Sequence, residues 1–209
     1  IDECAIDDFG NPMGIIRGSS PSRPPIFVVA HLDTFSEVSV DHHYEVTDKV
    51  IRGIGVSDNS AAVGVLVSLP EIFNRLNLRF SSDIVLVAPI LSLGRGNLKG
   101  IRRLLHRWPS PIQGAICLES IELGRLNYFS YGMIRGEISC SIAAEDHERH
   151  RHKPNAILVI NEVINAILGL RLPQKPRTQI VIGKIAGGFN HGNIAYDANI
   201  GFEIRSDSD

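Results

Sequence analysis

Apolar residues recur along the first 124 residues in a pattern that predicts alternating strands and helices. Continuous apolar runs at residues 26–30, 83–90 and 114–119 have the length of strands that are covered on both faces. A helical period extends from residue 59 to about residue 77, and a second helix is expected at about 101–107. Strands that alternate with helices favour a doubly wound α/β fold with a mostly parallel sheet.

Three shorter features complete this first region. Residues 13–18 read as a short strand, and residues 38–52 show a weak polar alternation that predicts a hairpin at a sheet edge. Pro70 lies inside the first helical period. Because proline lacks an amide hydrogen and clashes with the preceding turn, we expect it to kink or split that helix.

The pattern changes after Gly124. The expected order is strand, helix, strand, strand, at residues 133–144, 154–168, 178–185 and 199–205. This order is typical of a small α+β domain. We therefore divide the chain into two domains, residues 1–124 and 125–209.

Composition and charge narrow the possible functions. The chain has 209 residues, 44% of them apolar, and a formal net charge of −2. No strong positive field would attract nucleic acid, and no apolar stretch approaches the roughly 20 residues that span a bilayer. Cys4, Cys117 and Cys140 are odd in number and irregularly spaced, which favours reduced thiols in the cytoplasm or another reducing compartment. We expect neither nucleic-acid binding nor membrane insertion.

Candidate chemistry begins where the first covered strand ends, at His31-Leu32-Asp33-Thr34. Residues two apart in a strand share a face, so His31 can bind a divalent cation while Asp33 orients its ring. A second motif, Gly53-Ile54-Gly55-Val56-Ser57-Asp58-Asn59, places Asp58 at a glycine-rich turn before a helix.

These two motifs, His-x-Asp-Thr and Gly-x-Gly-x-x-Asp-Asn, resemble those of the zinc-dependent exopeptidases and deacylases. That family includes aminoacylases, peptidase T, acetylornithine deacetylase and succinyl-diaminopimelate desuccinylase. The resemblance implies that residues 1–124 are the first part of a metallopeptidase domain. Residues 125–209 would be an incomplete ferredoxin-like lid or dimerisation domain. The chain then resembles a truncated member that forms a homodimer or a larger complex.

The resemblance also implies a site for two zinc ions. One ion is held by the His of the first motif, a bridging Asp and an acidic residue that follows a later strand. These positions fall on His31, Asp58 and Glu119. Imidazole and carboxylate groups are normal zinc ligands, so the chain is expected to bind one zinc ion or none.

The second half of this zinc site departs from the family pattern. The family places a Glu-Glu pair before a Gly-x-Gly-x-Leu-x-Gly segment, and here the two positions are Ser92 and Leu93. Ser92 replaces the general base, a group that contributes typically about 10²- to 10⁴-fold to rate. Leu93 replaces a metal ligand. A further family His would lie beyond Asp209. We therefore favour a degenerate relative without catalysis.

Two substrate-binding positions of the family fall in the second domain. The register places Asp146 or His147 where the family has an active-site His, and Gly192 where it has an Asn. The charged run at residues 145–153 contains His147, His150 and His152, and it is either an adventitious metal site or a solvated loop.

Three functions remain open. The first is a non-catalytic binding, structural or assembly subunit. The second is a metal-dependent hydrolase of small peptides or N-acyl amino acids, completed by further sequence or by a partner. The third is a nucleotide-binding module, because Gly94, Gly96 and Gly100 follow a strand and Glu119 lies about 20 residues beyond, as in a dinucleotide fingerprint.

Overall fold

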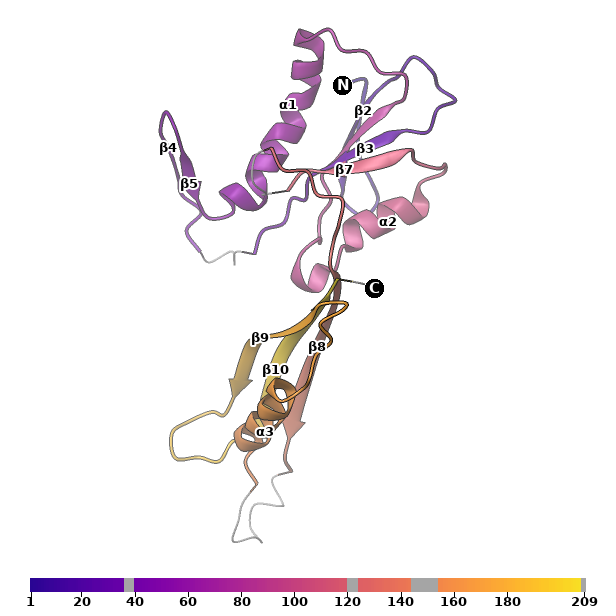
Figure 1. The fold of residues 1–209 in the computed structure, drawn as a ribbon. Coiled ribbons are helices and arrows are strands. Elements are labelled where there is room, and N and C mark those ends of the chain that lie inside the picture. Colours follow the sequence, from indigo (N-terminus) through magenta and orange to yellow (C-terminus); the bar gives the residue numbers. More distant parts are fainter. Residues whose placement is uncertain (36–39, 120–123, 144–153, 208–209) are drawn as a thin grey trace. The chain divides into compact units, whose positions relative to one another are not determined.

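The computed structural model describes residues 1–35, 40–119, 124–143 and 154–207. The chain folds into two compact units, Ile1–Arg125 and Leu126–Asp209 (Figure 1). The first unit has two hydrophobic cores and the second unit has one. Within the described ranges, no helix combines the length and the apolar character needed to cross a membrane.

The first unit is built on a five-stranded sheet with the order β1-β2-β6-β3-β7. Its strands are β1 (Glu3–Ile6), β2 (Pro12–Ile16), β3 (Ile26–Val29), β6 (Ile84–Val87) and β7 (Gly114–Cys117). β3 pairs in parallel with both β6 and β7, whereas β1 and β2 form an antiparallel hairpin whose second strand pairs with β6. The sheet is therefore mixed, with its parallel part where the apolar runs predict it.

Two helices cover opposite faces of this sheet (Figure 1). Val28 of β3 packs in one core with α1 (Ala61–Arg75), and Val29 packs in the other with α2 (Lys99–Arg107). Successive residues of a strand point to opposite faces, so an uninterrupted apolar run serves both cores. The doubly wound arrangement follows from this burial on two sides.

α1 is one helix from Ala61 to Arg75, with Pro70 inside it. The split that the sequence suggests at Pro70 does not occur. The helix buries Ala62 and Leu66 against the sheet, and such packing supplies most of a helix's stability in a protein. The missing hydrogen bond at Pro70 is therefore tolerated.

β7 was expected to be covered on both faces, and that expectation was wrong. All four of its residues are exposed, Ile116 to 52%. β7 ends the sheet in the described part of the chain, with β3 as its only strand neighbour there. An apolar run indicates that a strand can be buried, but it does not indicate how many other elements lie beside that strand.

The hairpin lies apart from the main sheet. β4 (Tyr44–Val46) and β5 (Ile51–Gly53) form a separate two-stranded sheet with every residue exposed. The sequence predicted the hairpin but not its separation from the edge of the larger sheet. The first residues of its expected range, 38 and 39, fall outside the described residues.

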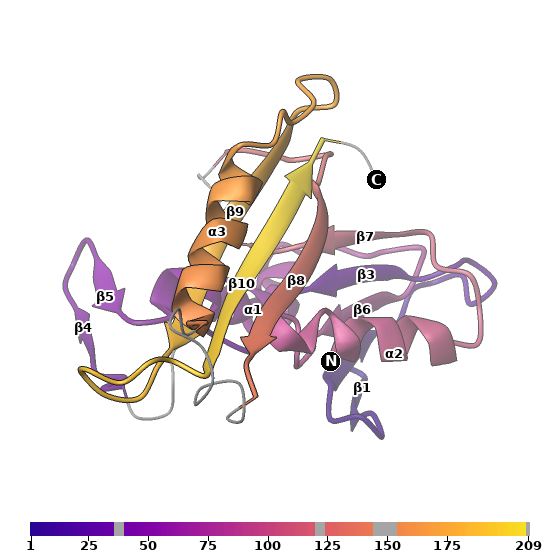
Figure 2. The same cartoon turned by 90° about the horizontal axis from the view of Figure 1, so that it is seen from below.

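The second unit is a three-stranded antiparallel sheet with one helix on one face (Figure 2). β8 (Gly132–Ser141), α3 (Ala156–Leu168), β9 (Thr178–Gly187) and β10 (Asp197–Ser206) follow in that order, and β10 lies in the middle. Asn155 caps α3 by accepting a hydrogen bond from the Ile157 amide at 3.0 Å. This β-α-β-β order agrees with the predicted elements.

Side chains on the two faces of this sheet differ in character. Ala156 and Ile160 of α3 pack on Ala198 and Ile200 of β10. The opposite face carries the ion pair between Arg135 and Glu203, with Arg135 Nε 2.7 Å from Glu203 Oε2, beside the partly exposed Val181. Antiparallel sheets commonly pack one face on the core and expose the other to solvent.

Asp83, directly before β6, ties that strand to the chain that leaves β2. Its carboxylate accepts a hydrogen bond from the Gly18 amide at 2.8 Å and pairs with Arg17 at 2.5 Å. The Gly18 amide, followed by the Arg17 guanidinium, holds the pKa of Asp83 below its usual range. Ionised Asp83 therefore stabilises the first unit.

Replacing this carboxylate tests its contribution. We expect Asp83→Asn to lower the free energy of unfolding by about 1–2 kcal/mol at pH 7, because hydrogen bonds to a charged group are lost. The difference from the native chain should persist above the unfolded pKa of about 4 and disappear as the pH falls through the lowered folded pKa. Urea unfolding between pH 7 and pH 2 measures both. Asp48→Asn, in the exposed turn of the hairpin, is the control; an equal loss there would contradict the prediction.

Candidate metal centre

Three side chains meet at the edge of the sheet where the parallel strands end. His31 follows β3 and Glu119 follows β7, and the parallel register pairs Val29 with Cys117. The carboxyl ends of neighbouring parallel strands lie at one edge, which is where open α/β sheets bind ligands. Asp58 lies in η1 (Val56–Ser60), the turn directly before α1, and its own backbone is not helical, with φ −124° and ψ 92°.

The turn that delivers Asp58 depends on Gly55, which has a φ of +73°. Glycine adopts this left-handed conformation without steric cost. A Cβ atom at Gly55 would also lie only 3.0 Å from Cγ2 of Thr34. The glycine of the sequence motif is thus explained by local backbone geometry.

The separations within the cluster suit a metal ion. His31 Nε2 lies 3.2 Å from Asp58 Oδ1 and 3.5 Å from Glu119 Oε2, and one ligand atom from each of the three residues falls within 4.8 Å of the others. Ligands about 2.0–2.2 Å from a tetrahedral zinc ion are themselves about 3.3 Å apart. The donor set and its spacing both fit zinc, and the two carboxylates balance its charge.

The ring of His31 is oriented for such a role. Its Nδ1 lies 2.9 Å from the main-chain carbonyl oxygen of Asp33. Because a carbonyl only accepts, this contact is a hydrogen bond when Nδ1 carries the proton, which leaves the Nε2 lone pair facing Asp58 and Glu119. His31 itself is buried.

Asp33 acts through different atoms from those that the sequence analysis assigned. The expected partner of His31 was the Asp33 carboxylate, but Oδ1 lies 3.8 Å from Nδ1. The carboxylate instead accepts hydrogen bonds from the amides of Ser92, at 3.0 Å, and Leu93, at 2.7 Å. Asp33 therefore joins the His31 loop to the loop after β6.

Ser92 and Leu93 bring no carboxylate to this edge. Ser92 is buried, and its Oγ has no hydrogen-bond partner within the described residues. The sequence holds no Asp or Glu between Asp83 and Glu119. Among the described residues, His31, Asp58 and Glu119 are the one group of three or more His, Cys, Asp or Glu side chains whose ligand atoms lie close enough to hold a metal ion.

Burial raises the pKa of Glu119 above its usual value. His31 acts in the opposite direction, and the charge of Asp58 adds to the increase. Two carboxylates brought together without a cation repel each other, so a divalent ion relieves an unfavourable arrangement.

Asn59 is a residue of this site to which the sequence analysis gave no role. Its side-chain Nδ2 donates to the Leu118 carbonyl at 3.2 Å and approaches the His31 carbonyl at 3.5 Å. Asn59 lies within the Asp-Asn motif, but a motif does not say which backbone groups its amide contacts.

Gly192 and His147 belong to the second unit. Gly192 is exposed and has a φ of +78°. His147 lies outside the described residues, as does the rest of the charged run up to residue 153. Their assignment to substrate binding stays a prediction.

The glycines of the dinucleotide-like segment have a structural explanation. A Cβ atom on Gly96 would lie 2.4 Å from the Leu91 carbonyl oxygen, and one on Gly100 would lie 2.1 Å from that of Ile90. At these two positions the absence of a side chain leaves room for the chain's own backbone near the start of α2. Glu119, assigned to a ribose in that interpretation, lies beside His31 instead.

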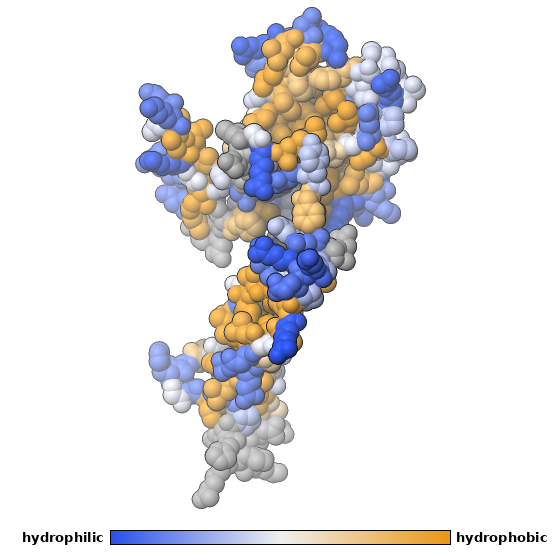
Figure 3. Space-filling view, viewed as in Figure 1, coloured by the Kyte–Doolittle hydropathy of each residue, from blue (hydrophilic) through white to orange (hydrophobic). Residues whose placement is uncertain are grey.

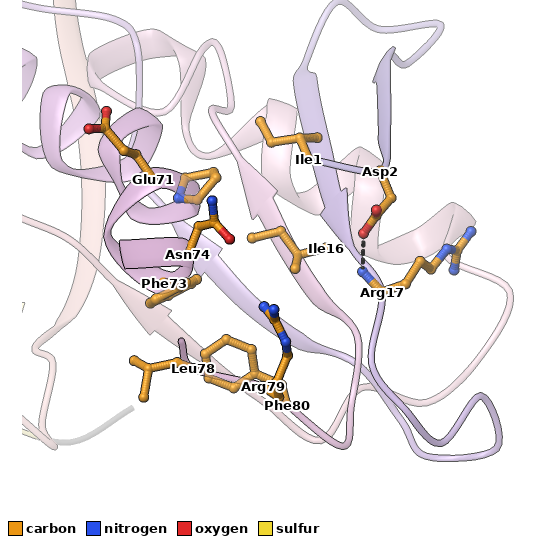
Figure 4. Close-up of a pocket in the computed structure, with 11 residues that line it drawn as sticks. Ile1, Asp2, Ile16, Arg17, Glu71, Phe73, Asn74, Leu78, Arg79 and Phe80 are labelled. Carbon is orange, nitrogen blue, oxygen red and sulfur yellow. Dashed lines mark hydrogen bonds between the residues drawn. The ribbon is translucent and has the colours of Figure 1, made fainter. Parts of the chain in front are cut away.

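A hollow of about 710 Å³ lies elsewhere in the first unit (Figure 4). Its walls include Ile16 of β2, Phe73 of α1, and Arg79 and Phe80. Ile16 pairs with Ile84, the first residue of β6, so the hollow is at the opposite end of the strands from the metal cluster. None of the three clustered side chains lines it.

Comparison with known proteins identifies the fold. No protein-family model matches the sequence, and no curated protein sequence matches it significantly. Solved structures do match. Aminobenzoyl-glutamate utilization protein from Klebsiella pneumoniae has a TM-score of 0.65 at 11% identity, over 95% of this chain and 46% of its own. Human carnosine dipeptidase 1 has a TM-score of 0.61 at 12% identity, over 94% of this chain and 56% of its own.

The description of a third matching structure includes a family name. The Bacillus subtilis YXEP protein, described as a dinuclear metal binding peptidase from the M20 family, matches with a TM-score of 0.55 at 12% identity. It is covered over 53% of its length, and this chain over 97%. This chain has the M20 fold. It spans about half the length of the M20-like structures that it matches, and the resemblance seen in the sequence motifs is confirmed at the level of fold.

Replacing Asp33 tests how the loops that follow β3 and β6 are held together. We expect Asp33→Ala to lower the free energy of unfolding by about 1–3 kcal/mol, because two amides lose a charged acceptor. Amide hydrogen exchange should accelerate at Ser92 and Leu93. The amide of Gly96, which donates to the Leu93 carbonyl within the same loop, monitors general loosening of the loop. Unchanged exchange at Ser92 and Leu93 would contradict this arrangement.

Proposed function

We propose that this chain is a diverged M20-type protein that binds one divalent cation, zinc by its donor set, and lacks hydrolytic activity on its own. The observation that carries the proposal is the cluster of His31, Asp58 and Glu119, whose ligand atoms all lie within 4.8 Å. The chain would serve as a binding, structural or assembly subunit in the cytoplasm or another reducing compartment.

The donor set supports the choice of metal. One imidazole and two carboxylates leave a fourth tetrahedral position open, as in many catalytic zinc sites. Zinc bound there would supply Lewis acidity toward an oxygen ligand. His31 would present Nε2, and the Asp33 carbonyl would hold the proton on Nδ1.

The loop after β6 supports the absence of catalysis. Ser92 offers a hydroxyl where the related motif has a general base, and a hydroxyl does not take up a proton at neutral pH. Leu93 offers no ligand for a second ion. The hydrolytic steps that need a base and a second cation would find neither.

Exposed apolar surface supports assembly into a homodimer or a larger complex. Orange apolar side chains lie open on the first unit in Figure 3. Ile116 on β7, together with Val65, Val67 and Ile72 on α1, is at least 39% exposed. Large exposed apolar patches mark interaction sites.

The hydrolase remains the second candidate, because the half-site has its three ligands close together and the matching structures include a dipeptidase and a dinuclear metal binding peptidase. Its substrates would be small peptides or N-acyl amino acids. It requires further ligands from additional sequence or from a partner.

The zinc content of the chain tests the proposed function. Protein purified without chelators or a His tag should carry one zinc per chain by elemental analysis. His31→Ala should carry none, because the ion loses its imidazole ligand, while His106→Ala on α2 should keep it. Two zinc ions per chain, or hydrolysis of dipeptides by the native chain, would favour the hydrolase instead. No zinc would reject metal binding.

Introducing a carboxylate pair at positions 92 and 93 tests whether these positions determine the number of zinc ions that the chain binds. Ser92→Glu with Leu93→Glu should raise the zinc content toward two ions, because carboxylates would then occupy the two positions where the related motif has them. Ser92→Gln with Leu93→Gln matches the size of these side chains without their charge and should keep one ion. A second ion in the Gln variant would show that the added negative charge is not what binds it. No second ion in the Glu variant would show that these positions do not face the metal site.

A further inference from the structure

Asn59 occupies the space between the loops that carry the three candidate ligands. Its side chain is almost fully enclosed, with the residue 1% exposed. Asn59 directly follows Asp58, its Nδ2 contacts the carbonyls of His31 and Leu118, and Leu118 directly precedes Glu119. One side chain therefore connects the backbones of all three ligands.

This connection begins where the sheet's own hydrogen bonds end. The ladder between β3 and β7 finishes with the Val29–Cys117 pair and the bond from the Leu118 amide to the Val29 carbonyl at 2.8 Å. Beyond that bond, the segments that follow β3 and β7 have no strand pairing to fix their separation. The amide of Asn59 supplies the next link, toward the Leu118 carbonyl and, more loosely, the His31 carbonyl.

The chemistry of the contact explains why an amide stands here. Both neighbouring groups are carbonyls, which only accept, so the NH2 group must face them. The other atom of the amide, Oδ1, is buried and has no partner among the described residues. A buried acceptor without a partner costs free energy, and this cost offsets part of what the hydrogen bonds from Nδ2 contribute to stability.

We propose that Asn59 is a positioning residue that sets the separation of His31, Asp58 and Glu119 and thereby the affinity and geometry of the metal site. The proposal rests on the proposed function, because it assigns a role toward the cation that those residues hold. Asn59 does not touch the cation. It acts through the backbone on either side.

Titration with Co²⁺ tests this role, because Co²⁺ occupies zinc sites and its visible absorption reports coordination geometry. Asn59→Leu keeps the approximate volume, and Asn59→Ala removes it. We expect both to raise the Kd for Co²⁺ by about 10- to 100-fold, the usual effect of losing an outer partner of a metal ligand, and to change the absorption bands. Ser82→Ala is the control, because it removes a buried hydroxyl that bonds Gln113 at 3.0 Å. Ser82 precedes β6 and Gln113 precedes β7, at the strand ends away from the ligands.

Metal-free melting temperatures separate positioning from general stability. A purely structural role would lower the melting temperature of the Asn59 variants and leave the Kd and the spectrum unchanged at temperatures where they are folded. That result would overturn the proposal, and so would a shift in Ser82→Ala as large as in the Asn59 variants.

The native chain supplies a measurement that does not depend on a folded variant. Zinc should shift the NMR signals of the Asn59 side-chain amide, since its carbonyl partners move with the ligands. Unshifted signals in zinc-loaded protein would overturn the role of Asn59. Failure of the native chain to bind Co²⁺ at all would overturn the proposed function, and with it any role of Asn59 toward a metal.

Discussion

The parallel pairing of β3 with β6 on one side and β7 on the other is the interaction on which the rest of the first unit depends. Val28 of β3 lies beside Leu86 and Ile116 in this register. Those strands are far apart in sequence, so only the ladder brings their ends together. A shift of one residue would reverse the faces of every side chain, and both cores and the cluster at the strand ends would be lost together.

Side chains take over from the ladder where the strands end. The Asp33 carboxylate holds the amides that begin the loop after β6, and the buried Asn11 side chain accepts from the Ile90 amide at 3.0 Å and donates to the Gly100 carbonyl at 3.1 Å. Loops at a sheet edge carry backbone groups that no strand satisfies, and buried groups of this kind need partners. The site is thus assembled by hydrogen bonds between side chains and main chain.

The sequence predicted those features of the fold that depend on local pattern. Apolar runs placed β3 and β6 because both strands are covered by helices on two faces. The two motifs gave His31 and Asp58, and the family resemblance gave Glu119. The exposure of β7 depends on which strands lie beside it, a property of the whole sheet that no window of sequence contains. The atoms used by Asp33 and Asn59 were also beyond prediction, since residue identity does not fix whether a carbonyl, a carboxylate or an amide makes the contact.

The negative charge available where the parallel strands end is sufficient for one divalent cation but not for two. Asp58 and Glu119 together offer two negative charges, enough to neutralise one divalent ion. A second ion would share Asp58 and find Ser92 and Leu93 in place of carboxylates, so its charge would remain uncompensated in a partly buried site, where solvation is weak. In the proposed function, the chain keeps the geometry for the first cation without the electrostatic conditions for a second, so chemistry that needs both ions would be absent while binding of one ion remains.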